Sequence, residues 1–237
     1  MLEEIMLRGA AAMGIAMTEA QARQFALYHA LLTAANARMN LTRVPDEPRE
    51  AADRNYLDCI SPLSGDFPTA ANAVDVGSGA GFPGIPLSIM LPDTHFTLMD
   101  ALGKRVEFLQ SVIDTLHLNA EARHMRAEDA AHDPALREAF DLGVARAVAP
   151  MNVLCEFLLP FVKVGGHALA MKGPNLDAEL SEAGGAIALL GGRLERTVAL
   201  PIPGRDWGHR GAWIEKIAPT PDKYPRRAGM PEKRPLK

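Results

Sequence analysis

A short apolar segment that leads directly into a cluster of glycines constrains this chain more than any other feature. Residues 73–76 read Ala-Val-Asp-Val, and four glycines follow within eight positions: Gly77, Gly79, Gly81 and Gly84. An apolar run then extends from Ile85 to Leu91. Glycine loses more conformational entropy on folding than any other residue, so this density indicates a backbone that closely approaches a ligand. A strand, a glycine loop and a helix in this order predict a binding loop for a nucleotide-type cofactor.

Short strands and helices alternate along most of the chain. We expect strands at 96–99, 121–124, 141–145 and 167–171, and helices at 49–60, 103–116, 151–162 and 176–190, the last interrupted at Gly184 and Gly185. Residues 193–200 and 212–217 have the pattern of an antiparallel pair that closes the sheet. Strands that alternate with helices of this length predict an α/β fold, with a Rossmann-like, mostly parallel sheet and helices on both faces.

The composition divides the chain into three parts. Residues 1 to about 37 have the apolar spacing of helices, and Thr18 with Gln21 is placed as a capping box. Prolines and a glycine between 61 and 71 mark the joint to the region of alternating strands. We expect an N-terminal helical extension at 1–65, the sheet-containing domain at 66–217 and a basic C-terminal tail at 218–237.

The C-terminal end of the chain is basic, although the whole chain is not. The net charge is −4, whereas residues 216–237 carry seven Lys or Arg and two Asp or Glu, a balance of +5 that leaves −9 for the rest. This asymmetry indicates contact with a polyanion at one end, and a solubilising tail is the other reading. Basic side chains neutralise phosphates and aromatic rings stack on bases, so the candidates for nucleic-acid contact are Lys223, Tyr224, Arg226 and Arg227.

Several classes of protein are disfavoured by the sequence. No run reaches the roughly 18 apolar residues of a membrane span, and Glu3 and Glu4 stand where a secretion signal carries positive charge. Cys59 and Cys155 are far apart and lack metal-ligand spacing, so we expect buried thiols in a reducing compartment and no metal site. We expect a cytoplasmic protein without a membrane partner, and a monomer.

The residues that follow the predicted strands are the candidates for a binding site. Open parallel sheets bind ligands at the carboxyl ends of their strands. The residues at these positions are 77–82 after the first strand, then Asp100, Ala127 with Glu128, and Arg146. Asp100 lies 21 residues beyond Gly79, where an acid accepts hydrogen bonds from ribose hydroxyls. Asp100 could instead cap the helix that follows it, and the two roles are compatible.

Two cofactors suit this layout. Gly79-Ala-Gly81-Phe-Pro-Gly84 fits G-x-G-x-x-G, so an NAD(P)-dependent oxidoreductase is one reading. Pro83 and Pro86, however, stiffen the segment in which a dinucleotide fold runs its helix up to the pyrophosphate. Asp75, two residues before the first glycine, suits a cofactor that carries an amine. Its carboxylate can hold loop amides and face the α-amino group of S-adenosylmethionine, which is the cofactor we favour.

The glycine stretch, together with motifs elsewhere in the chain, resembles a known family. The matching segments are Val-Asp-Val-Gly-Ser-Gly-Ala-Gly-Phe-Pro-Gly-Ile-Pro-Leu (74–87), Met39-Asn40-Leu41-Thr42, Thr97-Leu98-Met99-Asp100, 104–109, Arg146-Ala147-Val148-Ala149, Met171-Lys172-Gly173 and 223–231. In combination they resemble the bacterial small-subunit ribosomal RNA guanine-N7 methyltransferases, also called the glucose-inhibited division protein B family. The similarity extends from about residue 30 to 236. It implies a class I methyltransferase fold with an N-terminal helical extension, S-adenosylmethionine as cofactor and small-subunit ribosomal RNA as partner.

The resemblance also implies roles for individual residues. Cofactor contacts carry over to Gly77, Phe82, Ala127, Glu128 and Arg146, beside Asp75, Gly79 and Asp100 from the reading above. For the reaction itself we expect Arg146, with Asn40 and Lys172 bordering the RNA cleft. This chain has Asn55-Tyr56-Leu57-Asp58 where the family often has His-Ile-Leu-Asp. If Arg146 serves only the fold, we expect a salt bridge to Asp141 or Glu128.

The reaction implied by the resemblance is methylation of guanine N7. The fourth strand is not followed by the Asn-Pro-Pro-aromatic segment typical of exocyclic-amine methylation. Cytosine C5 methylation needs a thiolate, and Cys155 has no basic neighbour in sequence. Guanine N7 carries an unprotonated lone pair, so in-line transfer needs orientation but no general base, with Phe82 as the wall of an apolar methyl site. A catalytically inactive RNA-binding scaffold is the non-enzymatic alternative.

Overall fold

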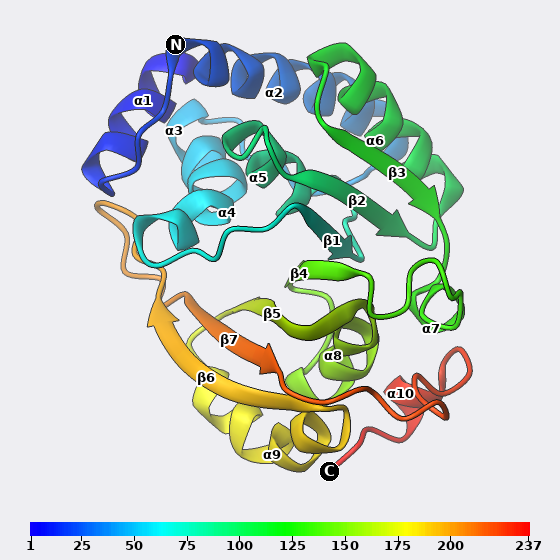
Figure 1. Cartoon of the computed structure of the whole chain (residues 1–237). Helices are drawn as coiled ribbons and strands as arrows, with labels where there is room; N and C mark the ends of the chain where they lie inside the picture. Colours follow the sequence, from blue (N-terminus) through cyan, green and yellow to red (C-terminus); the bar gives the residue numbers. More distant parts are fainter.

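Seven strands form one mixed sheet in the computed structural model, which describes residues 1–237 (Figure 1). The strands are β1 (Asn72–Val76), β2 (His95–Asp100), β3 (Ala120–His124), β4 (Phe140–Arg146), β5 (Val162–Lys172), β6 (Gly192–Ala199) and β7 (Arg210–Lys216). Their order is β3-β2-β1-β4-β5-β7-β6. The first five are parallel, and β7 runs antiparallel to both β5 and β6. The predicted α/β class and the closing antiparallel pair are confirmed.

Helices cover both faces of the sheet. One face is covered by α1 (Leu2–Ala12), α2 (Glu19–Met39), α3 (Pro48–Ala51), a π-helical segment (Ala52–Leu57), α4 (Asp58–Ile60), a 3-10 turn (Ser61–Ser64), α5 (Gly84–Met90) and α6 (Gly103–Leu116). The other face holds α7 (Ala127–Ala130), α8 (Met151–Leu158), a 3-10 turn (Leu159–Phe161), α9 (Leu176–Leu189) and α10 (Met230–Lys233). In Figure 1, α2 and α6 lie toward the top of the view, on the side of β3, and α9 lies at the bottom, beyond β6.

Alternate residues of the central strands enter two separate cores. In β1, Ala73 packs among the N-terminal helices, whereas Val74 and Val76 pack with α8 and its neighbours. Successive side chains of a strand point to opposite faces, so Asp75 shares the side of Ala73. Its carboxylate is therefore directed toward the layer of the N-terminal helices, where it is fully buried.

The N-terminal helices pack as part of the sheet's core. The capping box at the start of α2 is confirmed, because Gln21 N donates to Thr18 Oγ1 (3.2 Å) and Thr18 N donates to Gln21 Oε1 (2.9 Å). Phe25, Tyr28 and Leu32 on α2 are fully buried in the same apolar cluster as the sheet residues. The predicted extension thus shares one continuous core with the sheet. No helix is both long and apolar enough to span a bilayer.

Four predicted elements differ from the structure. The helix expected at 151–162 ends at Leu158, because Pro160 lacks the N–H that would continue it. The strand expected at 167–171 therefore begins earlier, at Val162. The helix at 176–190 is not interrupted at Gly184 and Gly185, because buried apolar residues along α9 hold it in the second core. The helix at 49–60 contains a π-helical segment, a distortion often found at functional sites.

Candidate active site

The glycine loop after β1 is held by the end of β2. Gly77 N and Ser78 N both donate to Met99 O at 2.9 Å, and Gly79 N donates to Asp100 Oδ2 at 2.9 Å. Gly77, Gly79 and Gly81 have φ values of 76°, 61° and 108°, which other L-residues adopt only with strain. The glycines are therefore required by the path of the loop.

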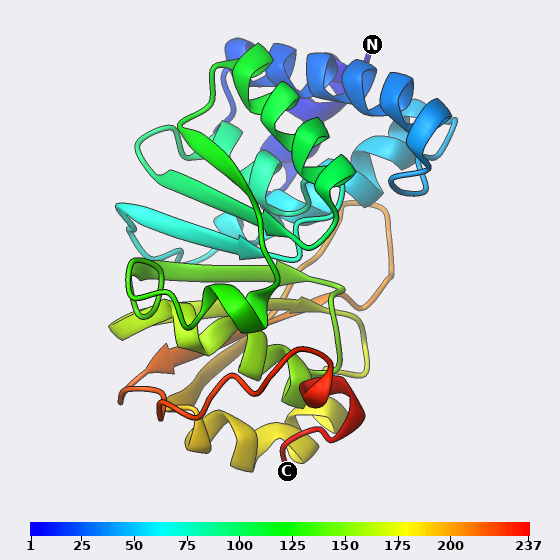
Figure 2. The ribbon, with the colours of Figure 1, turned by 90° about the vertical axis from the view of Figure 1, so that its right-hand side faces the viewer.

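A cavity of about 700 Å³ opens at the carboxyl ends of the parallel strands. The predicted site residues that line it are Gly77, Gly79, Phe82, Arg146 and Lys172. The loop after β6 closes one side with Leu200 and His209, and the start of the α2–α3 connection contributes Leu41 and Thr42. Figure 2 shows this orange loop beside the connection that follows α2. The 200–209 loop thus forms a wall of the cavity that the sequence analysis did not predict.

Arg146, at the end of β4, is fixed at the cavity by three contacts. Its Nη1 donates to Asp58 Oδ2 (2.8 Å) and to Arg54 O (2.9 Å), and its guanidinium carbon lies 4.7 Å from the centre of the Phe82 ring. Nη2 and Nε make no hydrogen bond within the protein, so they remain available to a ligand. Burial disfavours the charged guanidinium, but the neighbouring Asp58 outweighs this and raises the pKa of Arg146.

Asp58 joins Arg146 to the loop after β6. His209 Nδ1 donates to Asp58 Oδ1 at 2.7 Å, while Arg146 occupies Oδ2. Burial alone would raise the pKa of Asp58, but His209 and Arg146 outweigh it and lower that pKa. The structural alternative, a salt bridge from Arg146 to Asp141 or Glu128, is therefore wrong, since Asp58 is the partner. Asp58 and His209 are site residues that sequence reasoning missed.

The sequence contains a signal for only one of these two residues. Asp58 ends the segment Asn55-Tyr56-Leu57-Asp58 and matches the acid of the family pattern, whereas no motif singles out His209. Asn55 is buried, its Nδ2 has no hydrogen-bond partner, and it does not line the cavity. The residue in this segment that reaches the cavity is thus Asp58.

Phe82 belongs to a cluster of aromatic rings below the cavity. It is 7% exposed, and its ring centre lies 5.9 Å from that of Tyr28 and 6.0 Å from that of Tyr56. Tyr28 is fixed in turn, because its hydroxyl donates to Ala80 O in the glycine loop at 2.6 Å. Aromatic neighbours at these distances hold one another in place. Phe82 is therefore a rigid apolar surface beneath the guanidinium of Arg146.

Asp75 supports the loop from below rather than lining the cavity. Its Oδ2 accepts a hydrogen bond from Gly84 N at 2.9 Å, as expected of a carboxylate that holds loop amides. It does not border the cavity, so the expectation that it faces the cofactor's amino group does not agree with this geometry. Strand alternation turns the side chain toward the N-terminal helices. Its Oδ1 has no partner, and burial raises the pKa of Asp75 to about 7.

Replacing Asp75 with asparagine is expected to change how stability depends on pH. The folded state holds a proton on Asp75 up to a pKa of about 7, whereas the unfolded chain releases it near 3.8. This group therefore stabilises the fold below about pH 4, and its contribution disappears as the pH rises through 7. The stability of wild type relative to the variant, from urea unfolding between pH 4 and 8, should fall with rising pH. A difference that does not vary with pH would show that this carboxyl titrates normally.

Asp100, Ala127 and Glu128 are not among the residues that line the cavity. Asp100 Oδ1 accepts from Leu102 N at 2.9 Å at the start of α6, and Oδ2 accepts from Gly79 N and from Arg105 Nη1 (3.3 Å). Asp100 thus supports the glycine loop and the turn before α6, whose N-cap is Leu102 rather than Asp100. The expected contact of Asp100 with ribose hydroxyls stays a prediction. Glu128 is buried, and its Oε1 accepts a hydrogen bond from Gly229 N at 3.0 Å.

The two residues expected at the RNA cleft differ in position. Lys172 lines the cavity at the end of β5, where its Nζ donates to Glu179 Oε2 at 2.6 Å and to Ala149 O. Asn40 is exposed in a left-handed conformation that ends α2. Asn40 itself does not line the cavity, but the next residue, Leu41, does.

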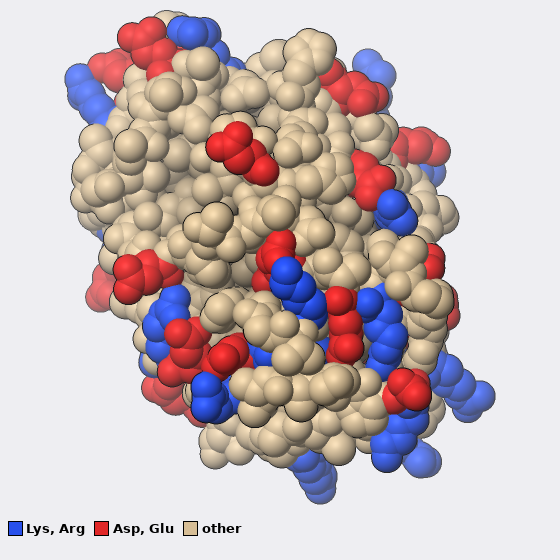
Figure 3. Space-filling model, viewed as in Figure 1, with Lys and Arg blue, Asp and Glu red and all other residues tan.

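The C-terminal segment is packed against the protein rather than extended. Tyr224 is 7% exposed, and Arg226 pairs with the buried Glu156, so internal contacts occupy two of the four side chains expected to bind RNA. Lys223 and Arg227 remain exposed. Lys216, which we counted in the basic end, is fully buried and cannot contribute to a basic surface. On the face seen in Figure 3, basic and acidic side chains stand side by side.

Comparison with known proteins identifies the family. A model of the GidB family, described as rRNA small subunit methyltransferase G, matches residues 21–205. A ribosomal RNA small subunit methyltransferase G from Clostridium perfringens (strain SM101 / Type A) is 42% identical over 99% of this chain and 98% of its own. The chain belongs to the rRNA small subunit methyltransferase G family. A further member, from Pelotomaculum thermopropionicum, is 45% identical over 99% of both chains.

Family membership confirms the resemblance read from the motifs. It makes the chain an S-adenosylmethionine-dependent enzyme that methylates small-subunit ribosomal RNA, rather than the oxidoreductase left open by the spacing of the glycines. The fold is shared more widely. The branched-chain polyamine synthase C9 mutein from Thermus thermophilus has a TM-score of 0.56 at 12% identity, over 85% of this chain and 64% of its own.

The residues at the cavity suit S-adenosylmethionine. The loop backbone from Gly77 to Ala80 borders the cavity, and a Cβ added at Gly77 would lie 3.0 Å from Val148 Cγ2, so a larger residue would crowd this wall. The free Nη2 and Nε of Arg146 are donors of the kind that a cofactor carboxylate requires. The loop and Arg146 would hold the cofactor, and Asp100 would keep the loop in place.

Proposed function

We propose that this enzyme transfers a methyl group to N7 of a guanine in small-subunit ribosomal RNA, in line and without a general base. S-adenosylmethionine, when bound, supplies a methyl group on a positively charged sulfur. Guanine N7 carries no proton, so no residue has to remove one. The task of the chain is to hold N7 at near-attack distance in the correct direction.

The observation that carries this proposal is the arrangement of Asp58, Arg146 and Phe82. Asp58 fixes one nitrogen of Arg146 at 2.8 Å, and the guanidinium stacks on Phe82 beside the glycine loop. This leaves two guanidinium nitrogens to bind the cofactor carboxylate, guanine O6 or a phosphate. Phe82 supplies an apolar surface, which suits a reaction in which the positive charge of the methyl donor disappears.

Asn40 and Lys172 complete the proposed RNA-facing side. Lys172 is held at the end of β5 by Glu179, and in this position its ammonium group faces the cavity that contains Arg146. Asn40 stands exposed where α2 ends, next to the Leu41 wall. In this proposal, residues 1–65 form the extension that presents Asn40, and residues 66–217 carry the methyl-transfer site.

Isothermal titration of the purified protein separates the proposed enzyme from its alternatives. We expect S-adenosylmethionine to bind and NADH not to bind. Binding of NADH with no S-adenosylmethionine signal would overturn the cofactor assignment. Binding of S-adenosylmethionine without methyl transfer to unmodified small-subunit RNA would instead favour a catalytically inactive RNA-binding scaffold.

Mapping of modified guanines in cells tests the position of the methyl group. Reduction followed by aniline cleaves RNA at N7-methylguanosine. Small-subunit RNA from a strain that lacks this gene is therefore expected to lose one cleavage site that the parent strain shows. Reintroducing the gene should restore the site. An unchanged cleavage pattern in the deletion strain would contradict methylation at N7.

A further inference from the structure

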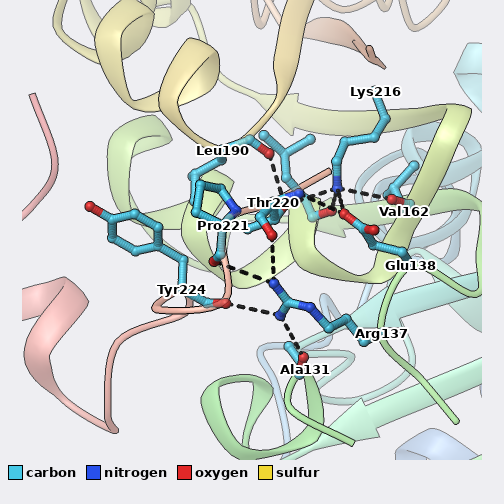
Figure 4. Close-up of polar contacts among 10 residues, drawn as sticks. Ala131, Arg137, Glu138, Val162, Leu190, Lys216, Thr220, Pro221 and Tyr224 are labelled. Atoms are coloured by element: carbon cyan, nitrogen blue, oxygen red, sulfur yellow. Dashed lines mark hydrogen bonds and ion pairs between the residues drawn. The ribbon is translucent and has the colours of Figure 1, made fainter. Parts of the chain in front are cut away.

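The C-terminal strap, which we define as residues 217–237, is anchored to the core at its beginning by a buried lysine. Lys216 is fully buried at the end of β7, and its Nζ donates to Glu138 Oε1 (2.9 Å), Thr220 Oγ1 (2.9 Å) and Leu159 O (2.7 Å). Glu138 Oε1 also accepts from Thr220 N at 2.6 Å. Figure 4 shows that Lys216, Glu138 and Thr220 meet at the start of the strap. Removing one partner of such a buried pair is costly, so this anchor holds the start of the strap on the core.

Arg137 ties the strap to the segment that follows α7. Its Nη1 donates to Ala131 O and to Tyr224 O, both at 2.9 Å, and its Nη2 donates to Thr220 O at 2.7 Å (Figure 4). One guanidinium thus bonds carbonyls of the α7 end and of the strap at the same time. His132 Nε2 adds a second link, at 2.8 Å from Pro225 O.

The far part of the strap reaches Glu128 itself. Arg226 binds the fully buried Glu156 through Nε and Nη2, and its backbone N–H donates to Glu156 Oε1 at 2.7 Å. Three residues later, Gly229 N donates to Glu128 Oε1 at 3.0 Å. A bond of an N–H to a carboxylate is charge-assisted and directional, so it fixes where the Glu128 side chain lies.

The short helix that carries Glu128 depends on these links. Ala127–Ala130 is only four residues long, and a helix of this length has no stability of its own. The strap bonds Glu128 within this helix and His132 just after it. Arg137, which bonds the strap, also bonds Ala131 at the end of the helix. The helix α7, which carries the proposed cofactor contact Glu128, is therefore held in position from the C-terminal end of the chain.

We propose that the C-terminal strap is a positioning element of the cofactor site, which fixes α7 and the Glu128 carboxylate, rather than a free arm that binds RNA. This inference rests on the proposed function, because it takes Glu128 as a cofactor contact. It replaces the prediction that Tyr224 and Arg226 contact RNA, because both side chains make contacts within the protein. Removal of the end of the strap is therefore expected to weaken cofactor binding.

A truncation and a matched pair of arginine variants test the proposal. The protein lacking residues 228–237 loses the Gly229 amide but keeps the Arg226–Glu156 pair. Its Kd for S-adenosylmethionine, by isothermal titration, should rise about tenfold, the factor that corresponds to about 1.4 kcal/mol. Arg226→Gln should have a similar effect, whereas Arg227→Gln, which removes the neighbouring exposed charge, should leave that Kd within about twofold. Thermal unfolding confirms that each variant is folded at the titration temperature.

The outcomes separate this proposal from the one on which it rests. The double variant Glu156→Gln with Arg226→Gln removes both charges and serves if Arg226→Gln alone does not fold. Weaker S-adenosylmethionine binding by Glu128→Ala and by the truncation supports the strap as a positioning element. Weaker binding by Glu128→Ala alone overturns the strap proposal only. Unchanged binding by both overturns the cofactor role of Glu128, and with it that of the strap.

Discussion

Replacing Arg146 with alanine is expected to leave the protein folded and to reduce methyl transfer by about a hundredfold or more, as removal of one preorganised donor does in other enzymes. Arg146 is the charged group at the end of β4 with nitrogens free to meet a ligand, and Asp58 and Phe82 already hold it in place. Transfer of labelled methyl groups to unmodified small-subunit RNA, measured beside circular dichroism of the same preparation, gives the result.

Two further variants make the Arg146 prediction specific. Arg146→Lys keeps the charge, but an ammonium lacks the planar fork that binds Asp58 and a ligand together, so most of the activity should remain lost. Arg193→Ala is the control, because Arg193 is exposed and pairs with Glu215 on β7, away from the cavity. Near-normal transfer by Arg146→Ala would remove this residue from the mechanism.

Replacing Asp58 with asparagine is expected to reduce both stability and activity. Asp58 is 5% exposed and is the carboxylate that balances Arg146, so the variant leaves a cation at the cavity without its partner. Removing one member of a buried pair costs about 3 kcal/mol, which urea unfolding measures. Because Arg146 also loses the contact that orients it, we expect methyl transfer to decrease by about tenfold to a hundredfold at a temperature where the variant is folded.

His209→Gln is the matched control for Asp58→Asn. It disturbs the bond to Asp58 Oδ1 but leaves the Arg146 pair on Oδ2 intact. Its effect on methyl transfer should therefore be smaller than that of Asp58→Asn. If the two variants lose equal activity, His209 is as important as Arg146 and the account of Asp58 as the support of Arg146 is incomplete. If Asp58→Asn retains full activity, Arg146 does not depend on it.

The position of the site could be predicted from the sequence because it follows from local pattern. The glycine loop, the strand ends and the antiparallel closing pair are each encoded within about ten residues. Parallel strands bring their carboxyl ends to one edge, so Gly77, Arg146 and Lys172 meet at the cavity although they are far apart in sequence. Alternation along β1 also places Asp75 on the opposite side from Val74, toward the N-terminal helices and away from the cavity.

The partners of these residues could not be predicted in the same way. Asp58 lies 88 residues before Arg146, and His209 lies 151 residues beyond Asp58, so no local pattern joins them. The net charge of the C-terminal end overstates its exposed basic surface, because a count of basic residues does not show which of them pair with acids. Lys216 and Arg226 bind Glu138 and Glu156, and only packing reveals this. Local pattern identifies a site, whereas long-range packing decides what each charge does there.

Methylation of RNA in a purified system shows directly whether this enzyme modifies N7 of guanine and whether Arg146 is needed. Small-subunit RNA from a strain lacking the gene is incubated with the purified enzyme and methyl-labelled S-adenosylmethionine, digested to nucleosides and separated. We predict that the label is recovered as 7-methylguanosine with the wild-type enzyme and is nearly absent with Arg146→Ala. Label on another base, on another atom of guanine, or in equal amounts with both proteins would contradict the account.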